Sequence, residues 1–156
     1  MTRREAFIAL NMMTSLGPVR VRNLVAALGS PEAVFTASET DLRGAQGIGA
    51  EVARGILDQR GAVDPAAEEA RAGAVGAHII TQDDAEYPEA LKQIYDPPLA
   101  LYVRGKIIKE DRHAIGVVGT RHATHYGQSV ADKLTAMTGA QPNLGTCPIV
   151  ASTSMP

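Results

Sequence analysis

Hydrophobic side chains in the N-terminal part of the chain recur every three or four positions, which is the spacing of amphipathic helices. This pattern predicts helices over residues 5–13, 18–28 and 50–59. Further helical segments are expected to start after Ser30 and Ser38, since serine is a favourable N-cap residue. The first 60 residues are therefore predicted to be all helical.

Two glycine-containing turns each join a pair of these helices, at residues 16–18 and 47–49. This order is typical of helix–hairpin–helix motifs, in which backbone N–H groups at the start of the second helix can hold a DNA phosphate. Arg20 and Arg22 follow the first turn and Arg54 follows the second, so their guanidinium groups are candidate phosphate contacts. The alternative is a helical bundle with ordinary glycine turns, because helix ends use glycine frequently.

Beyond residue 61 the pattern changes, and short apolar runs alternate with helical segments. Strands are predicted over residues 77–81, 99–103 and 114–118, and helices over residues 64–75, 86–94 and 125–138. Such alternation indicates an α/β unit with parallel strands. The predicted organisation is thus a helical domain over residues 1–60 followed by an α/β unit over residues 64–139.

The end of the sequence differs in kind from the rest. No charged residue occurs from residue 138 onward, although 21% of the whole chain is charged. Pro142, Pro148 and Pro156 interrupt the segment, and it has no amphipathic pattern that would cover a sheet. Residues 140–156 are therefore predicted to be an aberrant, disordered tail.

The net charge of −2 gives no general signal for a nucleic-acid partner, but the charge is unevenly distributed. Residues 1–30 and residues 101–156 each carry +3, whereas residues 31–100 carry −8. A phosphate backbone would meet the local charge rather than the sum. The total therefore does not exclude a phosphate ligand.

Cysteine content and hydropathy indicate the cellular compartment. The single Cys147 excludes an internal disulfide and fits a reducing environment. No apolar run reaches the length of a membrane span, and Glu5 and Asn11 interrupt the apolar segment that a signal peptide needs. The sequence predicts a cytoplasmic protein with no membrane partner.

The sequence offers no convincing catalytic or metal-binding cluster. His113, His122 and His125 are close in sequence, but no cysteine or acidic ligand has matching spacing. The carboxylates within residues 83–86 are interpreted as a solvated charge run, and Cys147 has no base partner. We therefore predict no catalytic residue, no metal and no cofactor, and the protein is not expected to be an enzyme.

The most informative stretch is residues 114–127, where an apolar strand, a tight turn and a helix follow one another. In α/β proteins this arrangement builds anion-binding crevices. Gly119 allows backbone donors to approach closely, Thr120 adds a hydroxyl, and Arg121 adds a planar fork of donors that suits phosphate. The turn is thus a candidate phosphate site, the alternative being a structural turn with an exposed arginine.

Two further side chains near this turn fit the same use. Thr124 is placed to cap the following helix and to offer another hydroxyl, and Tyr126 can stack on a base. The glycine spacing matches neither the dinucleotide fingerprint nor a P-loop. The expected ligand is therefore a phosphate of another kind, such as that of a nucleic acid.

Taken in order and spacing, these segments resemble the DNA-processing protein A (DprA/Smf) family of bacteria. The likeness covers roughly residues 5–139 and begins with the two-hairpin helical start. It continues through residues 29–33, 87–88 with Leu91, 96–98, 101–105 and 117–121, and ends at Thr124, Tyr126 and Gly127.

The resemblance implies a helical domain similar to the sterile-alpha-motif fold, followed by a Rossmann-like domain with a parallel sheet. It also implies single-stranded DNA binding without catalysis, loading of the RecA recombinase during natural transformation, and dimerisation through the Rossmann-like part. The turn over residues 119–121 matches the DNA-phosphate pocket of the family, so Arg121 is the main expected contact.

The sequence also departs from the family. Members continue from the last helix into a second strand and a Ser-Gly-x-Ala-x-Gly-Ile-Asp turn, neither of which occurs here. We therefore expect a truncated member, produced by a frameshift or as a gene fragment, whose homodimer surface is lost and whose DNA binding is weak. Two alternatives are a nucleotide or nucleotide-sugar phosphate-processing enzyme with a Rossmann-like fold, and a protein-interaction module that uses the helical domain.

Overall fold

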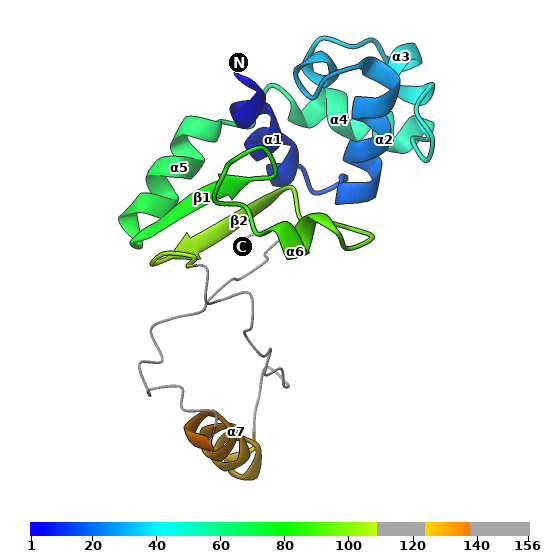
Figure 1. The fold of residues 1–156 in the computed structure, drawn as a ribbon. Coiled ribbons are helices and arrows are strands. Elements are labelled where there is room, and N and C mark those ends of the chain that lie inside the picture. The colour runs from blue at the N-terminus through cyan, green and yellow to red at the C-terminus, as the bar shows by residue number, and fades with distance from the viewer. Residues whose placement is uncertain (109–123, 138–156) are drawn as a thin grey trace.

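The computed structural model describes residues 1–108 and 124–137, which form a mixed structure of helices and a small sheet (Figure 1). The predicted strand over residues 114–118 and the predicted tail over residues 140–156 lie outside the described residues. In chain order the elements are α1 (Arg3–Met12), α2 (Pro18–Leu28), the 3-10 helix η1 (Glu32–Phe35), α3 (Glu39–Arg43), α4 (Ala50–Gln59), α5 (Pro65–Ala74), β1 (Ala77–Thr81), α6 (Glu89–Lys92), β2 (Ala100–Arg104) and α7 (His125–Met137).

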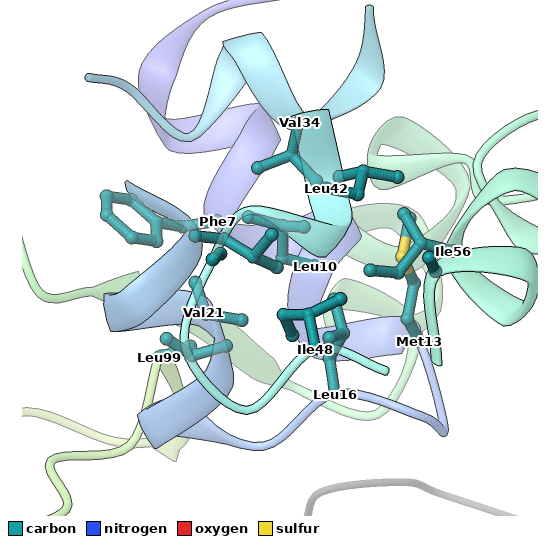
Figure 2. Close-up of a cluster of buried hydrophobic side chains, with 13 residues drawn as sticks. Phe7, Leu10, Met13, Leu16, Val21, Val34, Leu42, Ile48, Ile56 and Leu99 are labelled. Atoms are coloured by element: carbon teal, nitrogen blue, oxygen red, sulfur yellow. The ribbon is translucent and has the colours of Figure 1, made fainter. Parts of the chain in front are cut away.

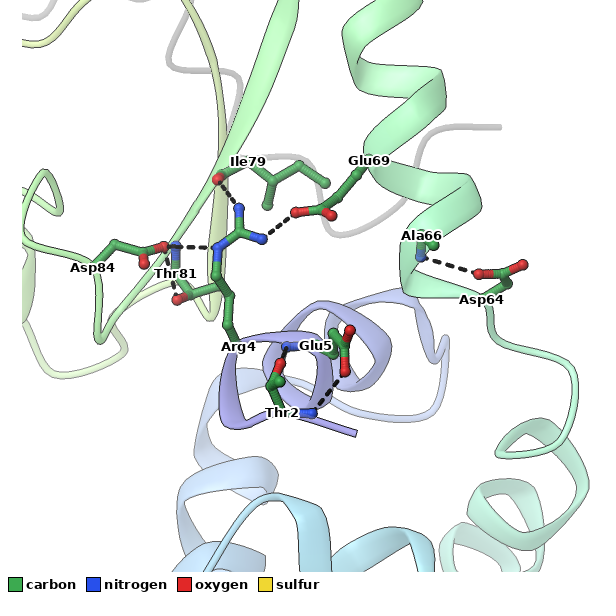
Figure 3. Close-up of polar contacts among 9 residues, drawn as sticks. All are labelled: Thr2, Arg4, Glu5, Asp64, Ala66, Glu69, Ile79, Thr81 and Asp84. Carbon is green, nitrogen blue, oxygen red and sulfur yellow. Dashed lines mark hydrogen bonds and ion pairs between the residues drawn. The ribbon is translucent and has the colours of Figure 1, made fainter.

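Local capping chemistry sets several helix starts. Helix α1 begins two residues earlier than predicted because Thr2 and Glu5 form a capping box, in which each side chain accepts a hydrogen bond from the backbone N–H of the other residue. Ser38, at the predicted start of α3, forms a second capping box with Asp41. The carboxylate of Asp64 accepts hydrogen bonds from the first N–H groups of α5 (Figure 3). These caps satisfy donors that no helix can satisfy internally.

Helices α1 to α4 enclose the larger hydrophobic core (Figure 2). Their apolar faces were predicted from the periodicity, and their buried members fill one continuous cluster. Leu99, which directly precedes β2, also belongs to this core and so ties the second half of the chain to the helices. The cluster comprises Phe7, Leu10, Met13, Leu16, Val21, Leu24, Val34, Leu42, Ala45, Ile48, Ala53, Ile56 and Leu99.

Strands β1 and β2 pair antiparallel, with Ile79 opposite Tyr102 and Ile80 opposite Leu101. The prediction of a parallel sheet is wrong for this pair. The connection over residues 82–99 contains only the short helix α6, and the side chain of Gln82 at its start donates hydrogen bonds to the carbonyls of Pro97 and Pro98 near its end. The chain therefore re-enters the sheet at the end where it left.

The connection between the strands is less helical than predicted, because α6 covers only four of the nine residues expected over 86–94. Two side chains organise it instead. The buried Tyr87 donates its hydroxyl hydrogen to the carbonyl of Pro98 at 2.8 Å, and burial raises the pKa of this phenol to about 12. The side-chain amide of Gln82 donates to the carbonyls of Pro97 and Pro98 at 2.9 and 3.0 Å. Both ends of the connection are thereby tied together.

Helix α1 packs on both halves of the structure, because it lies between helices α2–α4 and the sheet (Figure 1). Its residues Phe7, Leu10 and Met13 point into the larger core. Ile8, on another side of the helix, packs with Ala72 of α5, Ile79 of β1 and Ala100 of β2. The helix therefore contributes to two hydrophobic clusters, one in each predicted domain.

Arg4 adds a polar connection between α1 and the second half (Figure 3). Its guanidinium donates to the carboxylate of Glu69, to the carbonyl of Ile79 at 2.8 Å, and lies 3.4 Å from the carboxylate of Asp84. Asp84 in turn accepts hydrogen bonds from the backbone N–H and hydroxyl of Thr81 at 2.7 and 3.0 Å. The interpretation of residues 83–86 as a solvated charge run is therefore wrong for Asp84, which is half-buried and structural.

A buried carboxylate lies between α5 and β2. Glu68 accepts hydrogen bonds from the hydroxyl of Tyr102 at 2.6 Å and from the guanidinium of Arg71. Burial would raise the pKa of Glu68, but these hydrogen bonds and the Arg71 charge outweigh it and hold the pKa below its usual value. Burial and the neighbouring carboxylate also raise the pKa of the Tyr102 phenol.

The lowered pKa of Glu68 predicts a pH dependence of folding stability. A carboxyl with a lower pKa in the folded state stabilises the fold above its unfolded-state pKa of about 4.3 and loses this contribution as the pH falls through the folded-state pKa. We expect the free energy of unfolding of E68Q to fall less steeply with decreasing pH than that of the wild type, measured by denaturant titration between pH 3 and pH 7. Y102F should flatten this pH dependence as well, since it removes the hydrogen bond that contributes most to lowering the pKa of Glu68. An unchanged pH dependence in E68Q would contradict the assignment.

Candidate functional site

The two predicted hairpins share two local features. Leu16 and Ile48 are both buried in the larger core (Figure 2). Each is followed by a glycine in an extended conformation that forms the N-cap of the next helix, Gly17 for α2 and Gly49 for α4. Neither glycine provides a side-chain cap. Helices α2 and α4 therefore both begin without a side-chain cap.

Each hairpin also contacts the helix that follows the other one. Asn23 of α2 donates its side-chain amide to the carbonyl of Gln46 in the second hairpin at 2.9 Å. Gln59 of α4 accepts a hydrogen bond from the backbone N–H of Thr14, beside the first hairpin, at 3.1 Å. This reciprocal arrangement fixes the two hairpins relative to each other.

Arg20 and Arg22 extend from α2 to different surroundings. The guanidinium of Arg20 donates to the carbonyl of Ser15 at 2.8 Å and so folds back over the first hairpin. The guanidinium of Arg22 donates to the carbonyl of Tyr95 at 2.9 Å, on the connection that leads to β2. Neither arginine forms an ion pair with a carboxylate of the described residues. Both can therefore accept an external anion.

Tyr95 is not among the site residues predicted from the sequence. The guanidinium carbon of Arg22 lies 5.5 Å from the centre of its ring, and 81% of the residue is exposed. The sequence marks Tyr95 only as one aromatic residue directly before Asp96-Pro97-Pro98, in a chain with 4% aromatic residues. The contact between Tyr95 and Arg22 joins residues 73 positions apart. It depends on the tertiary fold and cannot be predicted from the neighbouring sequence.

A small hollow lies beside Arg22, where α1 and α2 meet the connection between the strands. Its volume is about 180 Å³. Apolar side chains from the helices and from Leu99 line it, and Arg3, Arg22, Gln82 and Asp83 supply its polar part. Arg3 is paired with Asp83 at 2.6 Å and lies over the ring of Phe7 at 5.4 Å. This hollow is called the α1–α2 hollow below.

The central residues of the predicted phosphate turn, Gly119, Thr120 and Arg121, lie outside the described residues. Their assignment therefore stays a prediction. The helix that follows them is present as α7, within one residue of its predicted bounds.

Two side chains at the start of α7 belong to the same predicted site. The hydroxyl of Thr124 accepts a hydrogen bond from the backbone N–H of Gly127 at 3.2 Å, which confirms the predicted cap. Tyr126 is 80% exposed, as a base-stacking residue must be. Within residues 1–108 and 124–137, no group of histidine, cysteine and acidic side chains could hold a metal.

Comparison with known protein families tests the resemblance directly. The family model described as DNA recombination-mediator protein A matches residues 78–143. The Protein Smf of Synechocystis is 26% identical over 132 residues, which is 82% of this chain. The DNA processing protein DprA of Bacillus subtilis is 41% identical over 61 residues, which is 38% of this chain.

These matches support membership of the chain in the DprA/Smf family. The family match extends from β1 through the predicted phosphate turn and α7, so it contains the residues on which the phosphate site was predicted. The matched segments cover 33% of the Synechocystis protein and 20% of the Bacillus protein. This DprA/Smf chain thus spans a third or less of these relatives.

No solved structure matches this DprA/Smf chain significantly. Among the helices that the structure describes, none combines the length and the apolar character needed to cross a membrane.

Proposed function

We propose that this DprA/Smf chain binds single-stranded DNA and takes part in recombination of incoming DNA. The observation that carries the proposal is the match of residues 78–143 to a recombination-mediator family. This segment includes the turn formed by Gly119, Thr120 and Arg121, whose side chains and backbone donors suit a phosphate. Arg121 is the proposed main contact, with Thr124 and Tyr126 beside it.

The helical half supports the same function. The N-termini of α2 and α4 carry partial positive charge and N–H groups without side-chain caps, which favours contact with phosphates. Arg20 and Arg22 project from the first turns of α2 and hold no carboxylate among the described residues. We propose that the paired hairpins act as a helix–hairpin–helix unit that contacts the DNA backbone without reading its sequence.

We propose that the helical part over residues 1–60 and the segment over residues 64–139 correspond to the helical and Rossmann-like domains of the family. RecA recombinase is the proposed protein partner, and natural transformation is the proposed process. A cytoplasmic location follows from these partners.

The test is fluorescence anisotropy with a labelled single-stranded oligonucleotide and with a duplex of the same sequence. We expect the full chain to bind the single strand more tightly than the duplex, and R121A to weaken that binding about five- to tenfold, since one charge-assisted phosphate contact is lost. R43A, which removes an exposed arginine 4.0 Å from Glu39, is the charge-matched control. Tight binding that survives in R121A would overturn the pocket assignment, and absence of binding would overturn the function.

A further inference from the structure

Tyr95 is held on a connection whose backbone is fixed from both sides. Three residues further on, the carbonyl of Pro98 accepts hydrogen bonds from the hydroxyl of Tyr87 and from the side chain of Gln82. Arg22 binds the carbonyl of Tyr95 itself at 2.9 Å. An aromatic side chain on such an anchored backbone is pre-organised, so little conformational freedom is lost when a ligand stacks on it.

The surroundings of Tyr95 combine three features that suit one nucleotide. The aromatic side chain is 81% exposed and thus offers most of its surface to a flat ligand. The guanidinium of Arg22 lies beside it and has no carboxylate partner among the described residues. Arg22 also lines the α1–α2 hollow, whose volume of about 180 Å³ is below the 300–1,000 Å³ usual for small-molecule pockets. The hollow therefore has room for a single ring and not for a larger ligand.

The charges at the site suit an anionic ligand such as a phosphate. Asp83, the carboxylate that lines the hollow, is neutralised by Arg3 at 2.6 Å. Arg22 is thus left as the uncompensated charge of the lining. Single-stranded nucleic acids are held by this combination of an exposed aromatic ring and a neighbouring cation, because every base has a face that can stack and every nucleotide carries a phosphate.

We propose that Tyr95 and Arg22 form a nucleotide-binding platform for single-stranded DNA, with a base stacked on the Tyr95 ring and the adjoining phosphate on Arg22, which lines the α1–α2 hollow. This inference rests on the proposed function. The proposed platform adds a base contact at Tyr95, which is separate in the sequence from the predicted phosphate turn at Arg121.

Stacking can be separated from charge by comparing two labelled probes of equal length. One is a single-stranded oligothymidylate, and the other has the same backbone with abasic sites in place of the bases. We expect Y95A to weaken binding of the oligothymidylate about tenfold and binding of the abasic strand less than twofold. Y95F should bind both strands like the wild type, because it keeps the ring. R22A should weaken binding of both strands, because it removes a phosphate contact.

The neighbouring Ile94, which is also exposed, gives the matched control I94A on the same connection. It should bind both strands like the wild type. If the wild type binds the oligothymidylate and Y95A binds it equally well, the platform is overturned while the proposed function stands. If the wild type binds neither strand, the proposed function itself fails. Loss of RecA capture in Y95A with unchanged DNA affinity would assign the surface to a protein partner and overturn the platform.

Discussion

Replacing Ile8 with alanine is expected to lower the free energy of unfolding by about 2–4 kcal/mol. The side chain is 1% exposed and fills the space between α1, α5 and the sheet. Its truncation leaves a cavity at the contact between the two predicted domains, since α1 contributes its other side chains to the core of α2–α4. We therefore expect both halves to be destabilised together.

The chain provides two separate probes for this test. Residues 1–60 contain no tyrosine and the chain has no tryptophan, so tyrosine fluorescence reports on the second half. Far-UV circular dichroism is dominated by the helices, most of which lie in the first half. In denaturant titrations both probes should give one midpoint for the wild type and one lower midpoint for I8A. I8V, which keeps most of the side chain, should cost about 0.5–1.5 kcal/mol. Separate midpoints for the two probes would show that the halves unfold independently.

Replacing Arg20 and Arg22 together is expected to weaken single-stranded DNA binding by roughly tenfold or more at low salt. Both guanidiniums project from α2 beside a helix N-terminus without a side-chain cap, and their described partners are backbone carbonyls and one ring. Each phosphate that loses its cation should make the slope of log K against log salt less negative by about 0.7. The double variant should therefore change the slope by about 1.4.

A control with the same change in net charge is R43A combined with K92A. Both residues are exposed and pair with neighbouring carboxylates, Arg43 with Glu39 and Lys92 with Glu89. This control should bind with nearly the wild-type slope. If the control and the Arg20–Arg22 variant lose affinity equally, the effect comes from net charge, and α2 is not part of the DNA contact.

The local features of the fold were predictable because neighbouring residues set them. The capping box of Ser38 and Asp41, the start of α5 at Asp64 and the left-handed Gly29 at the end of α2 all involve residues within a few positions of one another. The bounds of α4 and β1 agree with the apolar pattern for the same reason. The order of the motifs likewise sufficed to identify the family.

The long-range contacts could not be predicted in this way. Arg4 reaches Glu69 and Ile79 across 65 and 75 residues, and nothing near Arg4 in the sequence marks it as a connection. The direction of β2 depends on how residues 82–99 return to the sheet, which periodicity does not encode. Of the predicted site residues, the structure shows the surroundings of Arg20, Arg22, Thr124 and Tyr126, and it places Arg22 beside Tyr95 rather than beside Arg20.

The most direct test of DNA binding is a titration of labelled single-stranded DNA with the full wild-type chain at salt concentrations between 50 and 300 mM. We expect log K to fall linearly with the logarithm of the salt concentration. With contacts from Arg20, Arg22 and Arg121, the slope should be about −2 or steeper. No binding at the lowest salt, or binding that does not change with salt, would contradict this expectation.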